Sequence, residues 1–263
     1  MTRQSQFSRR GVLQALAAAT GTGTLGWSGD LLALGDRKVG VARLDLPDLP
    51  DPRPGALTDL LREVSHNSSI SAEVRPALVD PGSEALFEHP FVVLSGDRGF
   101  EPLGDQALAN LRLYVREGGL LFVDDATGLE RSAFDDSVRR ELSRLLPGTP
   151  LRRIGRDHAI YRSFFLMRGV AGRMVVQPYL EGLWLGDITP VLYSRNDLLG
   201  AVWRSSSGGY ALEVVPGGER QRLQARRMAI NLVLFAVTGN YKRDVVHVKT
   251  LLKRMRRQGG YGE

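Results

Sequence analysis

Carboxylates cluster where an apolar run ends, in the segment Gly118–Asp136, GGLLFVDDATGLERSAFDD. The run Leu120–Val123 is typical of a buried parallel strand, and Asp124 and Asp125 follow it directly. Asp135 then opens a helical pattern. Because ligands of α/β proteins gather beyond the carboxyl ends of such strands, these acids are candidates for acid–base or metal chemistry.

The same acids have a structural interpretation that the sequence leaves open. Aspartate is among the best N-cap residues, so Asp125 or Asp135 could begin a helix. Adjacent strand residues point to opposite faces of a sheet. Asp124 and Asp125 therefore cannot both enter one site while the chain is still in the sheet.

A histidine between an acid and a tyrosine forms a second polar cluster, Asp157–Tyr161. His158 could act as a general base or a metal ligand, and Tyr161 is a candidate binding residue. With Asp124 and Asp135, His158 would complete an oxygen/nitrogen site for a divalent metal, and we expect the three to converge on one cleft at the carboxyl edge of the sheet. A histidine held in a structural hydrogen-bond network is the alternative, because no H-x-x-x-H spacing supports a metal site.

Two more polar loops follow apolar strands. The first loop is residues 95–99, SGDRG, in which Ser95 and Gly96 could line an anion-binding turn. The second is residues 193–197, YSRND, in which Ser194 and Asp197 are candidate binding residues. Residues 36–241 contain no G-x-G-x-x-G, no P-loop motif and no G-x-S-x-G elbow. The sequence therefore predicts neither a standard nucleotide cradle nor an α/β-hydrolase, and it identifies no cofactor.

Alternating strand and helix patterns must position these loops. Short apolar strand patterns occur at residues 39–46, 72–75, 91–94, 120–123, 174–177 and 190–193, and amphipathic or apolar helix patterns occur at 55–66, 103–117, 135–146 and 222–238. Helices between strands favour βαβ units. The predicted fold is an α/β, doubly wound, mainly parallel sheet with helices on both faces, in which 91–94 and 120–123 are adjacent, parallel and central.

Cysteine is absent, which excludes disulfides, thiolate metal sites and a cysteine nucleophile. The net charge of +6 lies at the two ends, since residues 1–35 total +2 and residues 242–257 total +6, whereas residues 36–241 total −1. A near-neutral body does not predict nucleic-acid binding. The basic segment is interpreted as a solvated helical face, with peripheral contact to an anionic membrane as the alternative.

The first 35 residues have the parts of a targeting segment. Arg9 and Arg10 precede an alanine-rich stretch, and no acid occurs before Asp30. This order matches a signal peptide, and the arginine pair resembles a twin-arginine export signal. The predicted organisation is a signal peptide at 1–35, an α/β domain at 36–241 and a basic C-terminal helix and tail at 242–263, with the mature protein exported to the periplasm.

Several short motifs occur in order along the body. They are His89-Pro90-Phe91, the pattern L-x-x-Y-x-x-x-G-G-x-L-x-x-D-D at 111–125, Phe134-Asp135-x-Ser137, Asp157-His158-x-Ile160-Tyr161 and LYSRNDL at 192–198. Together they resemble the bacterial family of unknown function numbered 4159, over about Val39 to Tyr241. The resemblance implies an amidotransferase-like, flavodoxin-like domain similar to class I glutamine amidotransferases. Those enzymes use a nucleophilic cysteine, so glutamine hydrolysis by that route is excluded here.

These observations predict a non-catalytic ligand- or partner-binding module of the bacterial cell envelope, whose pocket lies at the strand ends. The expected partner is an envelope protein or a small ligand. A hydrolase, metal-assisted, that uses Asp124, Asp135 and His158 is the alternative. The candidate binding residues are Ser95, Gly96, Asp125, Tyr161, Ser194 and Asp197.

Overall fold

The computed structural model describes residues 40–68 and 73–241, and the predictions made for 1–35 and 242–263 lie outside these residues. The described residues form a seven-stranded sheet in the order β2-β1-β3-β4-β7-β6-β5. No helix in these two ranges is long and apolar enough to cross a membrane.

Five strands of this sheet run parallel. They are β1 (Val41–Leu44), β2 (Ala77–Val79), β3 (Phe91–Gly96), β4 (Leu120–Asp125) and β7 (Ile188–Ser194). The order 2-1-3-4, with β7 beside β4, is the flavodoxin-like order of doubly wound folds. Every residue of β3 and β4 is buried, and the two strands are adjacent, parallel and central, as their apolar runs predict.

Two antiparallel strands extend the sheet beyond β7. They are β6 (Glu181–Leu185) and the two-residue β5 (Arg152–Arg153). A two-residue turn of Gly186 and Asp187 joins β6 to β7, and Gly186 has a positive φ of 58°. Tight hairpin turns of this kind favour glycine because it reaches positive φ without a steric cost.

Two predicted strands are wrong. Residues 174–177 form a loop, because the backbone N–H groups of Val176 and Gln177 donate to the side chain of Asn196 and not to a neighbouring strand. The described residues of the segment predicted at 72–75 are not in a strand either, and β2 begins only after Pro76. Proline has no N–H to donate to a ladder, so it is found at strand starts and edges.

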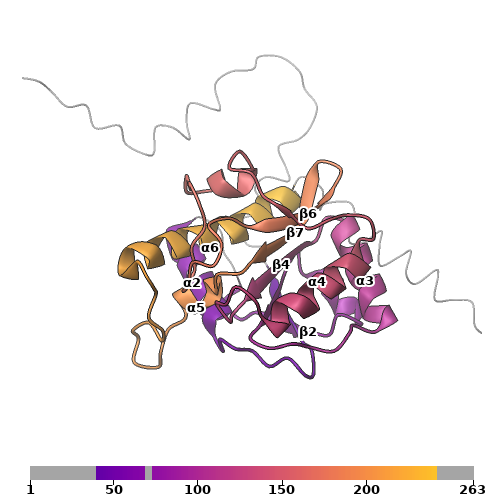
Figure 1. Cartoon of the computed structure of the whole chain (residues 1–263), viewed down its shortest axis with the longest axis horizontal. Helices are drawn as coiled ribbons and strands as arrows, with labels where there is room; N and C mark the ends of the chain where they lie inside the picture. Colours follow the sequence, from indigo (N-terminus) through magenta and orange to yellow (C-terminus); the bar gives the residue numbers. More distant parts are fainter. Residues whose placement is uncertain (1–39, 69–72, 242–263) are drawn as a thin grey trace, which may run out of the picture. The chain divides into compact units, whose positions relative to one another are not determined.

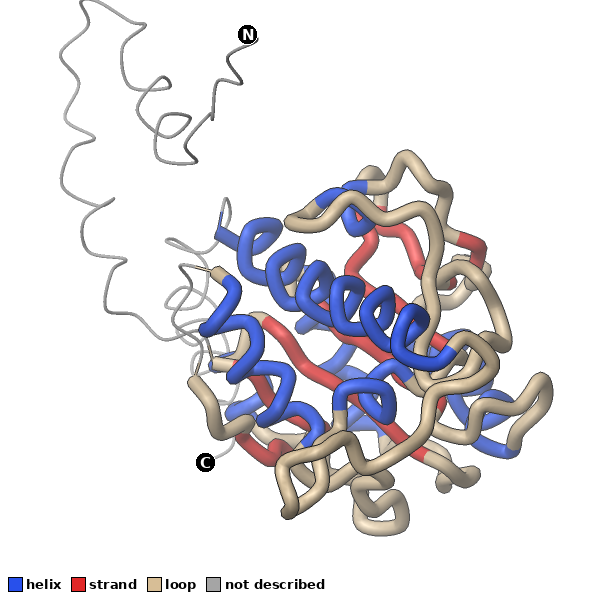
Figure 2. The backbone as a smooth tube through the Cα atoms, turned by 90° about the vertical axis from the view of Figure 1, so that its left-hand side faces the viewer, coloured by secondary structure: helices blue, strands red, loops and turns tan. Residues whose placement is uncertain are grey.

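Helices cover both faces of the sheet, as the fold prediction requires. One face carries α2 (Ala56–Asn67), α5 (Leu198–Val202) and α6 (Gly218–Tyr241), and we call it the α6 face. The other carries α3 (Asp105–Arg116) and α4 (Ala133–Leu145), and we call it the α4 face. Figure 1 shows the two helix groups on opposite sides of β4, and Figure 2 shows the long helix α6 lying over the strands. Two short 3-10 helices, η1 (Glu84–Glu88) and η2 (Ala159–Arg162), complete the described elements.

Alternation along β4 decides where each side chain goes. Leu120 and Phe122 pack in the core of the α6 face, and Leu121 and Val123 pack in the core of the α4 face. The alternation continues through the last two residues of β4, so the side chain of Asp124 lies on the α6 face and that of Asp125 lies on the α4 face. We call the end of the sheet where β3, β4 and β7 finish the carboxyl edge, and the end where they start the amino edge.

Candidate functional site

Asp124 is fully buried on the α6 face, where it holds the start of α5. Its two carboxyl oxygens accept hydrogen bonds from the backbone N–H groups of Leu198 and Leu199, at 2.9 and 2.8 Å. Burial, and then the negative charge of Asp197, raise the pKa of Asp124 to about 8. Burial therefore favours the protonated carboxyl group, and both of its oxygens are already engaged by α5.

Asp197 is the most heavily bonded acid at the carboxyl edge. It is fully buried, has a positive φ of 52°, and accepts from the N–H of Gly200 as the N-cap of α5. Arg53 donates to it through Nε at 3.2 Å and Nη2 at 2.7 Å, and Nε of Arg173 donates to the same carboxylate. A Cβ on Gly200 would lie 2.4 Å from this carboxylate, so only glycine fits there. The candidate binding residue Asp197 is thus bound by the chain's own cations.

Neither arginine is among the sequence candidates. Arg53 lies in the proline-rich segment before α2, and it also donates to the backbone carbonyl of Ala126. Arg173 lies in the loop between η2 and β6. Since buried charges in proteins are paired, a buried acid predicts a cation nearby, but the sequence does not say which of 35 Lys and Arg residues supplies it.

The loop after β7 is held by hydrogen bonds of two buried side chains, Ser194 and Asn196. The Ser194 hydroxyl accepts from the N–H of Asn196 at 3.2 Å, and both residues are fully buried. The Asn196 side chain accepts from the N–H groups of Val176 and Gln177 and donates to the carbonyl of Gln177 at 2.6 Å. All of these bonds are internal, so the candidate Ser194 contributes to loop structure in this arrangement.

Asp125, on the α4 face, is used in the turn that leads to α4. Its Oδ1 accepts from the N–H and the hydroxyl of Thr127, and its Oδ2 accepts from the hydroxyl of Ser132 at 2.8 Å. Ser132 is itself the N-cap of α4, because its Oγ accepts from the N–H of Asp135. The expectation that Asp125 or Asp135 caps this helix is therefore corrected: the cap is Ser132, and Asp125 positions it.

Asp135 lies on the α4 face, in the first turn of α4. It accepts from the Tyr193 hydroxyl and from Nε of Arg139, both at 2.9 Å, and Arg195 lies 3.5 Å away. Burial, followed by the charges of Asp125 and Asp135, raises the pKa of Tyr193 above its usual range. Tyr193 therefore stays protonated and serves as a donor to Asp135.

The turn after β3 does not form an open anion cradle. A Cβ on Gly96 would lie 2.4 Å from the Phe134 ring and 2.7 Å from Leu49, so apolar side chains pack against this backbone. Ser95 faces the other side, beside Asp124 in the β3–β4 register. Its buried hydroxyl has no hydrogen-bond partner among the described residues. The β1–β3 switch point, where flavodoxin-like folds bind ligands, is therefore filled by side chains on its α4 face.

His158 lies at the amino edge, away from the acids. Its Nε2 is 3.1 Å from Oγ1 of Thr189, and its ring packs 5.4 Å from the Phe235 ring between centroids. Val191 pairs with Leu121, so Thr189 and Asp124 stand five residue levels apart along the sheet, about 16 Å at 3.3 Å per residue. Tyr161 is buried in the core of the α6 face, and its hydroxyl accepts from the N–H of Leu180.

The expected convergence of Asp124, Asp135 and His158 is wrong. Asp124 and Asp135 lie on opposite faces of the sheet, and His158 lies at its opposite edge. Within residues 40–68 and 73–241, no group of three His, Asp or Glu side chains could hold a metal ion. The prediction failed at two points, because Asp135 lies in α4 on the other face from Asp124 and because the loop of His158 returns to the start of β7 and not to its end.

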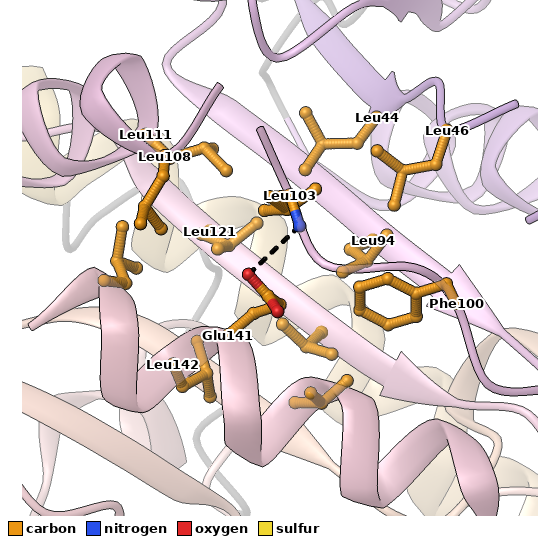
Figure 3. A pocket seen from close by; sticks show the side chains of 13 residues that line it. Leu44, Leu46, Leu94, Phe100, Leu103, Leu108, Leu111, Leu121, Glu141 and Leu142 are labelled. Carbon is orange, nitrogen blue, oxygen red and sulfur yellow. Dashed lines mark hydrogen bonds between the residues drawn. The ribbon is translucent and has the colours of Figure 1, made fainter. Parts of the chain in front are cut away.

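Two cavities in the described part of the chain bear on the site. The smaller, about 20 Å³, is enclosed in the apolar core of the α4 face, where Glu141 accepts from the N–H of Leu103 at 3.3 Å (Figure 3). It has room for about one water molecule. The larger, about 340 Å³, lies at the amino edge on the α6 face and is lined by Gly118, Gly119, Leu120, His158, Ala159, Asp187, Ile188, Thr189, Pro190, Phe235 and Ala236. None of the carboxyl-edge acids lines either cavity.

Comparison with known proteins places the chain in a family. No curated protein matches it. The family model described as "Domain of unknown function (DUF4159)" matches residues 41–237, which run from the first residue of β1 into the last turns of α6. The match covers both sheet edges and all the candidate residues. The chain therefore belongs to the DUF4159 family.

Proposed function

We propose that this protein is a non-catalytic ligand- or partner-binding module of the bacterial cell envelope. One observation carries the proposal: at the carboxyl edge, where an α/β enzyme of this strand order would place its reacting groups, the oxygens of Asp124, Asp125 and Asp197 accept hydrogen bonds from the chain itself. A general base or nucleophile needs a free lone pair aimed at substrate. These three acids have instead a structural use.

The strand order supports an amidotransferase-like fold, but the chain lacks the catalytic residue of those enzymes. The flavodoxin-like strand order fits an amidotransferase-like domain, whereas the absence of cysteine removes the nucleophile of those enzymes. Catalysis by Asp124, Asp135 and His158 as a unit would need them within reach of one substrate, and they are separated by the sheet and by its length. Binding without turnover is the function that remains supported.

The test of this function is whether the protein retains a bound compound or partner without converting it into a product. The protein would be expressed with its own N-terminus, isolated from the periplasm under native conditions and weighed by native mass spectrometry before and after long incubation. We expect a bound compound or partner whose mass does not change. Steady conversion of the bound compound into a product would contradict a non-catalytic role.

Export is the second element of the proposal, and it rests on Arg9, Arg10 and the alanine-rich stretch after them. Peripheral contact with an anionic membrane through residues 242–263 is part of the same picture. Replacing both arginines by lysine keeps the charge and removes the pair that the export receptor reads. We expect the double variant to stay in the cytoplasm, and its accumulation in the periplasm would contradict twin-arginine export.

A further inference from the structure

The amino-edge cavity lies between the start of β4, the β6–β7 hairpin, η2 and the last described turns of α6. Its volume of about 340 Å³ falls within the range of small-molecule sites in proteins. Most of its wall is apolar, from Leu120, Ile188, Pro190, Phe235 and Ala236. An occupant would therefore place an apolar body against these side chains.

Hydrogen bonds at the cavity wall fix the state of His158. Its Nδ1 accepts from the N–H of Ile160 at 3.1 Å, so Nδ1 carries no proton. Burial also lowers the pKa of His158 below its ordinary value, which favours the neutral ring. A neutral histidine whose Nδ1 accepts must carry its proton on Nε2. The proton on Nε2 then points to Thr189, and the contact of 3.1 Å is a donation from His158 to Oγ1.

The hydroxyl group of Thr189 is consequently available as a hydrogen-bond donor. Its buried hydroxyl accepts from His158, and no acceptor for its own O–H lies among the described residues. Thr189 lines the cavity. Because a buried donor left without an acceptor is costly, an oxygen of a bound molecule is the natural partner for this hydroxyl.

The charges around the cavity select against anions. Among the described residues that line the cavity, Asp187, exposed in the β6–β7 turn, is the one acid, and none is Lys or Arg. A carboxylate ligand would lose its hydration next to a like charge and gain no cation. An ammonium group has no lone pair to accept from Thr189. A hydroxyl group can both accept from Thr189 and donate to Asp187.

We propose that the amino-edge cavity binds a small uncharged molecule with an apolar body and a hydroxyl group that accepts a hydrogen bond from Thr189. This inference rests on the binding function proposed above and names its ligand class. The His158 ring is a positioning group, since it orients the threonine hydroxyl without being the donor to the ligand.

Three probes of one shape test the proposal on the full-length protein: benzyl alcohol, toluene and benzoate, titrated by ligand-observed NMR. Benzyl alcohol should bind most tightly, with toluene and benzoate each about tenfold weaker, the equivalent of one net hydrogen bond. Benzoate binding as tightly as the alcohol, or no binding of any probe, would overturn the proposal.

Matched variants locate the contact. Thr189→Val keeps the side-chain shape and should reduce the affinity for benzyl alcohol to that for toluene, whereas Thr189→Ser should keep it. Asp187→Asn should strengthen benzoate binding, and Asp136→Asn, an exposed acid on α4, should not. Thermal unfolding checks that the Thr189→Val variant is folded. If the folded variant binds benzyl alcohol with unchanged affinity, the proposed contact with Thr189 is wrong. If it does not fold, the Asp187→Asn and Asp136→Asn pair still decides the charge argument.

Failure of this inference and failure of the proposed function give different results. A compound retained from the periplasm equally by wild type and Thr189→Val would leave the binding function standing and remove this cavity as its site. If instead the probes bind at the cavity and the retained compound is converted to a product, the cavity stands as a binding site and the non-catalytic function is contradicted.

Discussion

The two edges of the sheet differ in how their polar groups are used. At the carboxyl edge, Asp124, Asp125 and Asp197 are fully buried, and each accepts at least two hydrogen bonds from the chain. At the amino edge, His158 and Thr189 form a short chain of hydrogen bonds that ends in an O–H with no acceptor among the described residues, beside a cavity of about 340 Å³. The oxygens of the carboxyl-edge acids are thus in use within the chain, whereas the amino edge presents a hydroxyl group to a cavity.

A cluster of polar side chains is not by itself a binding site. Acids after a buried strand mark a site only when their oxygens remain available, since buried polar groups in proteins are almost all hydrogen-bonded. The carboxyl edge meets that requirement internally, through Arg53, Arg173 and the N–H groups of α5. The edges should therefore respond differently to substitution, in stability at one and in binding at the other.

The largest expected effect is at Asp197. Asp197→Ala leaves the guanidinium groups of Arg53 and Arg173 without their buried partner and removes the cap of α5. Loss of one member of a buried ion pair typically costs about 3–5 kcal/mol of unfolding free energy. Urea denaturation measures it, with exposed Asp187→Ala as the amino-edge control, expected within about 0.5 kcal/mol of wild type. Equal losses in the two variants would erase the contrast between the edges.

A smaller loss is expected at Asn196. Asn196→Ala removes the side chain that accepts from Val176 and Gln177 and donates to the Gln177 carbonyl, which leaves those backbone groups unpaired. We expect a loss of about 1 kcal/mol, since an unsatisfied buried group costs roughly 1–3 kcal/mol and residues 176 and 177 are only half-buried. Hydrogen exchange at the amides of residues 176 and 177 should also accelerate. Unchanged protection there would show that Asn196 does not hold this loop.

The pH dependence of stability sharpens the account of Asp124. Its folded pKa of about 8 is above the unfolded value of about 3.9, so the folded state binds the extra proton between these values. Its contribution to stability is complete below about pH 4 and is lost as the pH rises to about 8, at up to roughly 1.4 kcal/mol per pH unit. The charges that face it are Asp197 and Asp125, and Arg53 and Arg173 partly neutralise Asp197.

Asp124→Asn should flatten this dependence, because asparagine does not titrate, although its one side-chain oxygen can keep only one of the two hydrogen bonds from α5. Unfolding free energies of the variant and of wild type, measured from pH 5 to pH 8, give the difference directly. Exposed Asp136→Asn is the control and should follow wild type. A wild-type stability that rises through this range relative to Asp124→Asn would mean that Asp124 is ionised in the folded protein.

The sequence predicted the parts of the molecule that depend on local pattern. The apolar runs of β3 and β4 specify strands buried on both faces, and both the strands and their adjacency are confirmed. The five-residue α5 and the two-residue β5 were not predicted, because periodicity cannot be read over so few residues.

The role of each polar group depended on contacts far apart in the chain. Arg53 and Asp197 are separated by 144 positions, and nothing local in either segment indicates the pair. His158 was assigned to the wrong edge for the same reason, since its partner Thr189 lies 31 positions away at the start of β7. Residue types at strand ends indicated candidates, whereas the fold alone decided which of them had free atoms.

The contrast between the edges is tested most directly by a map of amide chemical-shift changes when benzyl alcohol is added to the isotope-labelled, full-length protein. The shifted amides should gather at residues 118–120, 158–159, 187–189 and 235–236, around the amino-edge cavity. Amides of residues 124–125 and 194–200 should stay in place. Shifts that gather at those carboxyl-edge residues, with none at the amino edge, would contradict it.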